Sequence, residues 1–203
     1  MNEAEPAGRQ DSADGPQSDP ERQRPQPRIY VASLSDYNAG RLHGAWIDAA
    51  QEPDELLGDI DRMLSASPTR GAEEWAIHDY EGFGGLRLSE FESMGMVSLI
   101  ARGVVEHDVA FAAWAAHVGT TDTEVLNRFE DAYLGEWSSL EAYAEELLSD
   151  LGYDRLLDEV IPEPLRPYVA IDVAGFARDL QLSGDVSVVD QPSGEVWIFD
   201  GRL

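Results

Sequence analysis

The chain contains neither cysteine nor lysine, and all 14 of its basic residues are arginine. Without cysteine it can form no disulfide bond, use no thiol nucleophile and build no thiolate metal site. No window of about 18 residues is apolar enough for a transmembrane helix. The first residues also lack the basic stretch and apolar run of a secretory signal. We therefore expect a soluble, cytoplasmic protein with no membrane partner.

Positive charge is scarce in the chain as a whole. The 203 residues include 40 Asp and Glu, which gives a formal net charge of −26 and a pI near 4.2. Such a charge destabilises a compact fold by self-repulsion, and it excludes nucleic acid and anionic membranes as partners. It does not indicate general disorder, because 43% of the residues are hydrophobic and five Trp and seven Tyr can supply a core.

One late segment concentrates the negative charge. EELLSDLGYDRLLDEVIPE (145–163) has apolar residues at helical spacing, but its polar face is almost entirely acidic. Like charges four residues apart on a helix repel each other by ~0.2–0.5 kcal/mol per pair. Gly152 is a typical helix-stop residue, so we expect the acidic row to span a break between two helices. The row consists of Glu146, Asp150, Asp154 and Asp158.

The N-terminal half combines a polar tail with strands and a helix. Residues 1–28 hold few large apolar groups, which predicts a disordered tail. The β-rich runs 29–34 and 43–49 predict a hairpin with a long connection, and 73–83 predicts another strand. Apolar residues at helical spacing predict a helix after Pro53, a residue that suits a first helical turn. This apolar stripe consists of Leu56, Leu57, Ile60, Met63 and Leu64.

The middle of the chain is predicted to be helical. The sequence Ser-Glu-Phe-Glu at 89–92 has capping-box spacing and predicts a helix to about Gly103, and the Ala-rich residues 104–119 predict another. A second capping box at 138–141 predicts a helix that ends at Gly152.

The end of the chain predicts a short helix and a hairpin. The helix is expected around residues 176–180, and the hairpin at 186–200 has a Pro-Ser-Gly turn. Residues 128–137 by themselves are ambiguous between helix and strand.

An internal repeat bears on that ambiguity. The pattern G-x-W-x8-E-L-L-x-D-[IL] occurs at 44–60 and again at 135–151. If the two copies are related, each is a strand with a Trp that leads into an acidic helix, which favours a strand at 131–137. The alternative is a coincidence between two amphipathic helices that each follow a Trp.

Motifs of enzymes and metal sites are lacking. No two of the four histidines lie four residues apart, and no calcium loop, phosphate-binding loop or G-x-S-x-G sequence occurs. A carboxylate pair can perform glycosidase chemistry, but among 40 acids a pair at a suitable separation carries no information. We therefore predict no catalytic residue, no cofactor and no metal ligand.

The charge has the scale of a DNA duplex. B-DNA carries about one negative charge per 1.7 Å of axis, so 26 charges at that density cover roughly 44 Å, or about 13 base pairs. Carboxylates four residues apart on a helix are separated by a rise of ~6 Å, the scale of neighbouring phosphates. A folded chain of this composition can therefore present a DNA-binding groove with an imitation of a duplex.

Three segments resemble the ArdA antirestriction family. They are IYVASLSDYNAGRLHGAWIDA (29–49), EEWAIHDYEGF (73–83) and YVAIDVAGFARDLQLSGD (168–185). The most specific part, IDVAGFARDLQLSGD, is similar to the family's antirestriction motif, and the resemblance runs from about Arg28 to Phe199. The acidic N-terminal tail and the lack of lysine are not part of it.

The resemblance implies a fold and a homodimer. The fold is α+β: an elongated chain of three small domains, with α/β ends that contain short antiparallel sheets and a helical middle domain. On this sequence we place the N-terminal α/β domain at 29–88, the central helical domain at 89–126 and the C-terminal α/β domain at 127–203.

The resemblance also implies a function. Proteins of this family are carried by mobile genetic elements and imitate B-DNA, occupying the DNA-binding groove of type I restriction-modification enzymes without catalysis. Asp and Glu would engage Arg and Lys of the specificity and methyltransferase subunits. The predicted phosphate-mimicking residues are Glu130, Asp131, Glu136, Glu141, Glu145, Glu146, Asp150, Asp154, Asp158, Glu159, Asp172, Asp179 and Asp185.

Three alternatives remain open from the residues themselves. The chain can be an acidic decoy for a nucleoid protein or a transcription factor. It can be an enzyme with a carboxylate pair, such as a glycosidase, in which one Glu→Gln change would abolish activity. It can also be the acidic scaffold of a halophile, which would need molar salt to fold.

Overall fold

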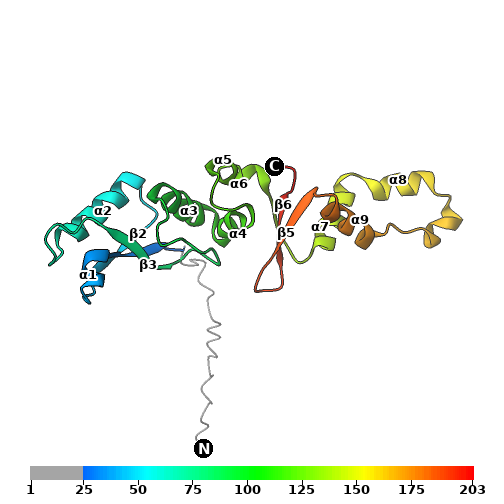
Figure 1. Ribbon diagram of the computed structural model, residues 1–203. Coiled ribbons are helices and arrows are strands. Elements are labelled where there is room, and N and C mark those ends of the chain that lie inside the picture. Colours follow the sequence, from blue (N-terminus) through cyan, green and yellow to red (C-terminus); the bar gives the residue numbers. More distant parts are fainter. Residues whose placement is uncertain (1–24) are drawn as a thin grey trace, which may run out of the picture.

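The computed structural model describes residues 25–203 (Figure 1). Most of the predicted disordered tail (1–28) therefore lies outside the described residues. Pro27 belongs to the fold, because it is buried and its carbonyl oxygen accepts a hydrogen bond of 2.9 Å from the N–H of Ala49. Within residues 25–203, no helix is both long and apolar enough to cross a membrane.

The described residues form an elongated row of elements (Figure 1). A three-stranded antiparallel sheet with its helices lies at one end, followed by helices, a second three-stranded antiparallel sheet and further helices at the other end. This mixture of helices and short antiparallel sheets confirms the predicted α+β class. The domain boundaries at residues 88 and 126 stay predictions.

The N-terminal sheet has β1 (Arg28–Ser33) at its centre. β1 is antiparallel to β2 (Gly44–Asp48) on one side and to β3 (Trp75–Glu81) on the other. The predicted hairpin and the predicted strand within 73–83 are both confirmed. The long connection of the hairpin contains a short helix, α1 (Leu34–Asn38).

The predicted apolar stripe forms helix α2 (Pro53–Ser65), which packs against β2. Pro53 occupies the first turn as predicted, and the N–H of Glu52 donates to the carboxylate of Glu55 (3.3 Å), as in a capping box. Four of the five stripe residues are buried, whereas Leu57 is 43% exposed. The helix is therefore held to the sheet by one apolar face.

The helical middle begins later than predicted. Helix α3 (Met94–His107) starts behind Ser93, whose hydroxyl oxygen accepts a hydrogen bond from the N–H of Met96 (3.2 Å). The capping box predicted at 89–92 is wrong, because this segment is tied to β3 instead. The N–H of Ile77 donates to the carbonyl oxygen of Glu90 (2.9 Å).

The prediction of one helix over residues 104–119 is wrong, because this segment belongs to two helices. The chain breaks at Asp108, which separates α3 from α4 (Val109–Val118) and has a φ of +58°, a value rare outside glycine. The break lets α4 fold back on α3. Gly103 and the ring of Phe111 are so close that a Cβ on Gly103 would lie 2.5 Å from ring atoms.

The C-terminal part contains the second sheet and further helices. In chain order its elements are α5 (Thr123–Leu126), α6 (Phe129–Ala132), β4 (Tyr133–Trp137), α7 (Leu140–Asp150), α8 (Tyr153–Val160), the 3-10 helix η1 (Glu163–Tyr168), α9 (Val173–Leu182), β5 (Val186–Asp190) and β6 (Val196–Asp200). The sheet order is β4-β6-β5, with antiparallel neighbours. The terminal hairpin is confirmed, and the helix predicted around 176–180 is longer than expected. The ambiguous residues 128–137 divide into α6 and β4.

Local signals fix most of helix α7, with one shift. Ser139, and not Ser138, is the N-cap, because its hydroxyl oxygen accepts a hydrogen bond from the N–H of Ala142 (3.2 Å). At the other end Gly152 has a φ of +75° and separates α7 from α8. The predicted break in the acidic row is confirmed.

The two sheets share an arrangement. Each has a central strand, β1 or β6, that is antiparallel to both neighbours. Each also has an edge strand with the repeated G-x-W sequence, β2 or β4, followed by an acidic helix, α2 or α7. The central strand comes first in the N-terminal sheet and last in the C-terminal one. That the two units are related stays a prediction.

Strand β6 separates two apolar cores. Trp197 and Phe199 belong to the large core, which extends through the middle helices to the N-terminal sheet. Val196 and Ile198 point the other way, because side chains alternate along a strand, and join a small core beside α7 and α9. The C-terminal helices therefore rest on a much smaller apolar base than the rest of the molecule.

Candidate partner-binding surface

The thirteen predicted phosphate-mimicking residues all lie between α6 and the start of β5. Helix α7 carries four of them, Glu141, Glu145, Glu146 and Asp150. The others are Glu130 and Asp131 on α6, Glu136 on β4, Asp154, Asp158 and Glu159 on α8, Asp172 and Asp179 at the cap and within α9, and Asp185 before β5.

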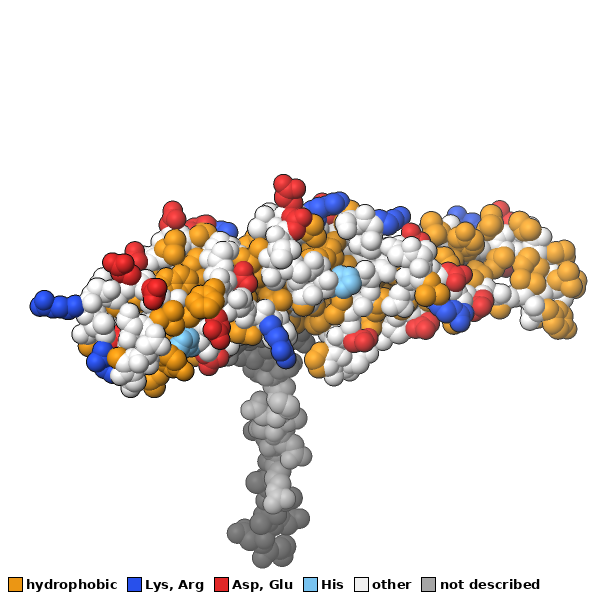
Figure 2. Space-filling view, in the orientation of Figure 1, with side chains coloured by type: hydrophobic (Ala, Val, Ile, Leu, Met, Phe, Trp, Pro, Cys, Tyr) orange, Lys and Arg blue, Asp and Glu red, His pale blue; other side chains and the backbone are white. Residues whose placement is uncertain are grey.

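These side chains point mainly to solvent. Eleven of the thirteen are exposed and Asp185 is half-buried, while nothing is described for the side chain of Asp154. Figure 2 shows acidic side chains distributed along the length of the elongated body. A basic partner can therefore reach most of these carboxylates without a rearrangement of the fold.

Helix α7 shows how the local sequence directs the charge outward. Ala144 and Leu148 are buried, and Leu140 and Tyr143 pack on the small core, so one face of the helix is fixed to the protein. The four carboxylates of α7 are exposed. Those four residues apart are separated by a rise of ~6 Å along the helix. The helix thus holds four exposed charges on a fixed backbone.

Besides Glu130, which lies 4.0 Å from His107, three of the predicted residues have partners among the described residues. Asp158 lies 3.6 Å from the guanidinium of Arg166 (Oδ1 to Nη1). Asp172 accepts a hydrogen bond from the N–H of Gly175 (2.8 Å) as the N-cap of α9, and Asp185 accepts one from the hydroxyl of Ser183 (2.7 Å). These carboxylates contribute to local structure. An aspartate directly before an apolar helical segment is a typical N-cap, so the position of Asp172 is a local signal for the start of α9 that was not used in the prediction.

Exposed acids of the N-terminal half are absent from the prediction. The first copy of the internal repeat (44–60), which leads into acidic helix α2, is a signal for them. Two of them have arginine partners, in the ion pairs Arg28–Glu81 and Arg102–Glu52. The exposed acids of this half up to β3 are Asp48, Glu52, Asp54, Glu55, Asp61, Glu73, Glu74, Asp79 and Glu81.

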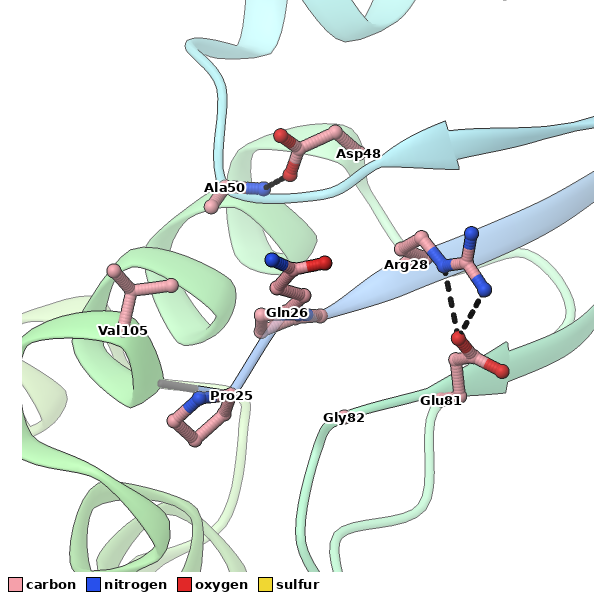
Figure 3. Close-up of a pocket in the computed structure, with 9 residues that line it drawn as sticks. Pro25, Gln26, Arg28, Asp48, Ala50, Glu81, Gly82 and Val105 are labelled. Atoms are coloured by element: carbon pink, nitrogen blue, oxygen red, sulfur yellow. Dashed lines mark hydrogen bonds and ion pairs between the residues drawn. The ribbon is translucent and has the colours of Figure 1, made fainter. Parts of the chain in front are cut away.

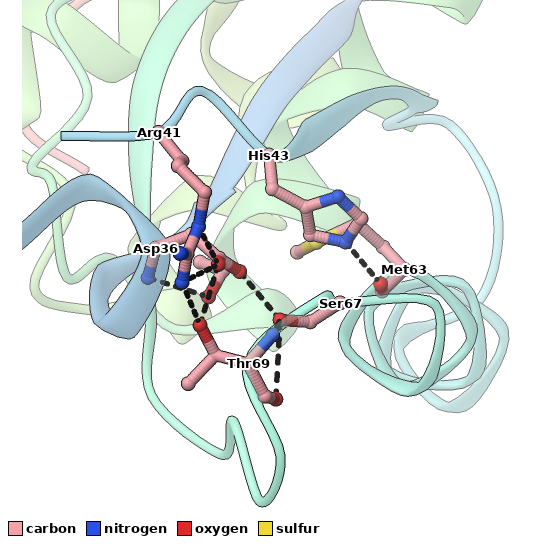
Figure 4. A network of polar contacts seen from close by, with 7 residues as sticks. Asp36, Arg41, His43, Met63, Ser67 and Thr69 are labelled. Atoms are coloured by element: carbon pink, nitrogen blue, oxygen red, sulfur yellow. Dashed lines mark hydrogen bonds and ion pairs between the residues drawn. The ribbon is translucent and has the colours of Figure 1, made fainter. Parts of the chain in front are cut away.

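One carboxylate is withdrawn from the surface altogether. Asp36 is completely buried, and its oxygens accept hydrogen bonds from the hydroxyls of Ser67 and Thr69 (2.6 Å for Thr69), with Arg41 also donating at 3.2 Å (Figure 4). These donors, the Ser67 hydroxyl first, hold the pKa of Asp36 far below its ordinary value, against the opposing effect of burial. Asp36 therefore joins α1 to the segment after α2 and has no access to a partner.

A surface cavity of about 940 Å³ is lined, among the described residues, by two carboxylates that both have hydrogen-bond donors (Figure 3). Of its two carboxylates, Glu81 is paired with Arg28, whose Nε donates to it at 2.8 Å, and Asp48 accepts a hydrogen bond from the N–H of Ala50 (2.9 Å). A glycosidase needs a general acid with a raised pKa. Bound donors instead lower the pKa of Asp36 and, through Arg202, that of Asp200, so neither suits this role.

The chain is similar to one known protein family. The model of a family described as antirestriction protein (ArdA) matches residues 29–194. The match includes both acidic helices and all thirteen predicted residues. No curated protein matches the chain.

Proposed function

Because this chain belongs to the ArdA family of antirestriction proteins, we propose that it protects incoming mobile DNA by imitating B-DNA. The chain occupies the DNA-binding groove of a type I restriction-modification enzyme and so excludes DNA. It is a competitive inhibitor and catalyses no reaction. The observation that carries the proposal is the series of exposed carboxylates on the C-terminal helices of an elongated body.

The partner in this proposal is a basic groove. Arg and Lys of the specificity and methyltransferase subunits, which contact the DNA backbone, bind the carboxylates in place of phosphates. Backbone contacts position a protein on DNA without reading its sequence, so one inhibitor can act on enzymes with different recognition sites. Because the attraction is between charges, the complex weakens as the salt concentration rises.

The active form in the proposal is a homodimer. Two copies, each with a formal charge of −26, repel each other, so their contact must be apolar. Exposed apolar side chains gather at the end of the molecule that α8 and η1 form, visible at the right of Figure 2. They include Leu156 (54% exposed), Val160 (71%) and Tyr168 (85%) on α8 and η1. We place the contact between copies there.

The dimer is tested by light scattering coupled to size-exclusion chromatography. The expected mass is that of two chains, and the double variant Leu156→Ser, Val160→Ser should give one chain with an unchanged circular dichroism spectrum. Leu42→Ser, which changes an 84% exposed leucine at the other end, is the matched control and should remain dimeric. A wild-type mass of one chain would contradict the dimer.

The inhibition is tested by competition. Purified protein is added to a type I enzyme bound to labelled DNA, and both DNA release and DNA integrity are followed. The expected result is release of unaltered DNA, less efficient at higher salt. Full occupancy of the DNA at a large excess of the protein would contradict the proposal.

A decoy for a nucleoid protein or transcription factor would use the same exposed carboxylates. A pull-down from a lysate that contains a type I system separates the two functions. Specificity and methyltransferase subunits are the expected partners. Recovery of a nucleoid protein without those subunits would favour the decoy.

A further inference from the structure

A histidine and two glutamates meet where α3 ends beside α6. His107 Nε2 lies 3.9 Å from an oxygen of Glu106 and 4.0 Å from an oxygen of Glu130. All three donor atoms lie within 4.8 Å of one another. Glu106 and His107 are adjacent in the sequence, but Glu130 follows more than twenty positions later, which is why no ligand spacing predicted this cluster.

We propose that Glu106, His107 and Glu130 bind a divalent transition-metal ion, with Zn²⁺ as the best match. An ion equidistant from three atoms that are at most 4.8 Å apart lies no more than about 2.8 Å from each. Zinc bonds to imidazole nitrogen and carboxylate oxygen are about 2.0–2.2 Å long. The ligand set therefore has to contract by less than about 1 Å.

The two kinds of ligand differ in the mobility that this contraction needs. The side chains of Glu106 and Glu130 are 72% and 78% exposed, so they can rotate toward an ion at little cost. That of His107 is only 22% exposed, and its ring packs on Phe111 (centroids 6.0 Å apart) and Phe129 (4.7 Å). His107 is the fixed ligand, and the glutamates close on it.

The chemistry of the ligands selects the ion. Imidazole nitrogen suits zinc, cobalt, nickel and copper, whereas calcium and magnesium prefer oxygen ligands alone. Two carboxylates balance the charge of a divalent ion. A cavity of about 400 Å³, which Glu106, His107 and Glu130 themselves help to line, leaves room for water as the fourth ligand.

A bound ion would join two parts of the chain. Glu106 and His107 end α3, whereas Glu130 belongs to α6, directly before the strand β4 of the second sheet. The ion would fix the helical middle to the C-terminal part and neutralise one of the predicted phosphate-mimicking carboxylates. This site does not depend on the proposed inhibition of restriction enzymes.

The test measures zinc binding to the full chain by calorimetry, in millimolar magnesium chloride that saturates weak carboxylate sites. The expected result is one zinc ion per chain, together with a higher Tm. Cobalt(II) in the same site should give visible absorption bands of a low-coordinate ion. In His107→Ala the zinc affinity should fall roughly tenfold or more.

Matched variants separate this site from general attraction to an acidic surface. Glu130→Gln should weaken zinc binding, whereas Glu124→Gln, which removes an exposed charge from α5, should not. His117→Ala removes an exposed histidine from α4 and should leave binding unchanged. If His107→Ala fails to fold, Glu130→Gln against Glu124→Gln decides the question, because both positions are exposed. Equal zinc affinity in that pair, or displacement of zinc by magnesium, would overturn the proposal.

Discussion

The two ends of the molecule use the same kind of unit in different ways. Each combines a three-stranded antiparallel sheet with an acidic helix after a G-x-W edge strand. In the N-terminal unit, the apolar face of α2 is buried in the large core, one aspartate is withdrawn into the interior, and arginines pair with several other acids. In the C-terminal unit, α7 rests on a small core and its carboxylates face solvent.

The difference teaches how a fold accommodates excess charge. Burying apolar area stabilises a protein, whereas like charges at its surface destabilise it. The N-terminal unit and middle helices hold most of the apolar contacts, so the C-terminal unit can display charge that its own small core would not support. The four predictions below probe this division, beginning with the largest effect.

The first concerns the two faces of β6. Phe199 is fully buried, and its ring contacts Trp114 (centroids 5.1 Å apart) and Tyr133 (5.7 Å) in the large core. Phe199→Ala should lower the free energy of unfolding by about 3–5 kcal/mol. Ile198→Val, on the small-core face, should lower it by only about 0.5–1.5 kcal/mol. Urea denaturation measures both, and a loss at Ile198, where only one methyl group is removed, as large as the loss at Phe199 would contradict the smaller weight of the small core.

The second concerns the buried Asp36. Its lowered pKa means that the folded state favours the charged form, so this stability is present above the ordinary Asp pKa of about 3.9 and is lost as pH falls below it. Asp36→Asn should reduce the Tm at pH 7 by roughly 5–10 °C. The difference from wild type should shrink as the pH is lowered below about 4.

Asp200 is the matched control for that experiment. Its pKa is lowered chiefly by a hydrogen bond from Arg202, whose side chain is 69% exposed, so solvent screens the interaction. Asp200→Asn should therefore reduce the Tm by less than Asp36→Asn, by roughly 1–3 °C. A larger loss at Asp200, or a pH-independent loss at Asp36, would contradict this account.

The third compares blocks of charge. Changing the four carboxylates of α7 to their amides should weaken competition with DNA about tenfold or more, because several charge contacts with the enzyme are lost together. The matched block, Asp54, Asp61, Glu73 and Glu74, removes the same charge from the N-terminal unit and should have a smaller effect. Equal losses would show that the whole length of the molecule binds the partner.

The fourth, and smallest, concerns a single charge. Glu145→Gln should change competition less than about twofold, because one exposed ion pair contributes little. The same measurement on Asp158→Asn should give an even smaller change, since that carboxylate already has Arg166 as a partner. Complete loss of inhibition from Glu145→Gln would indicate a catalytic carboxylate instead of a distributed surface.

Much of the fold could be predicted because its signals are local. Strand alternation, the apolar stripe of α2, Pro53 at its start and Gly152 after α7 act within a few residues. Ser89 failed as a cap because a hydrogen bond from Ile77 holds the neighbouring Glu90 against β3. Local sequence shows which residues can cap a helix, but a contact between residues far apart in the chain decides which of them does.

The candidate surface shows the same limit. The positions of acids opposite an apolar helix face predict which carboxylates are exposed, as on α7. The sequence could not show that Arg166 lies beside Asp158, or that Ser67 and Thr69 enclose Asp36, because these contacts join residues that are 8 to 33 positions apart. Exposure follows from local periodicity, whereas pairing depends on how the chain folds back.

The amino-acid sequence alone determined the negative charge, the identity of most helices and strands, and the family to which the chain is similar. Only the tertiary structure decided which charges are free, which are paired or buried, and that His107 lies between two glutamates. The physical reason is the distance along the chain over which each effect acts. Helix and strand preferences are set by neighbours within about four residues, while burial and ion pairing are set by the packing of elements that lie far apart in the chain.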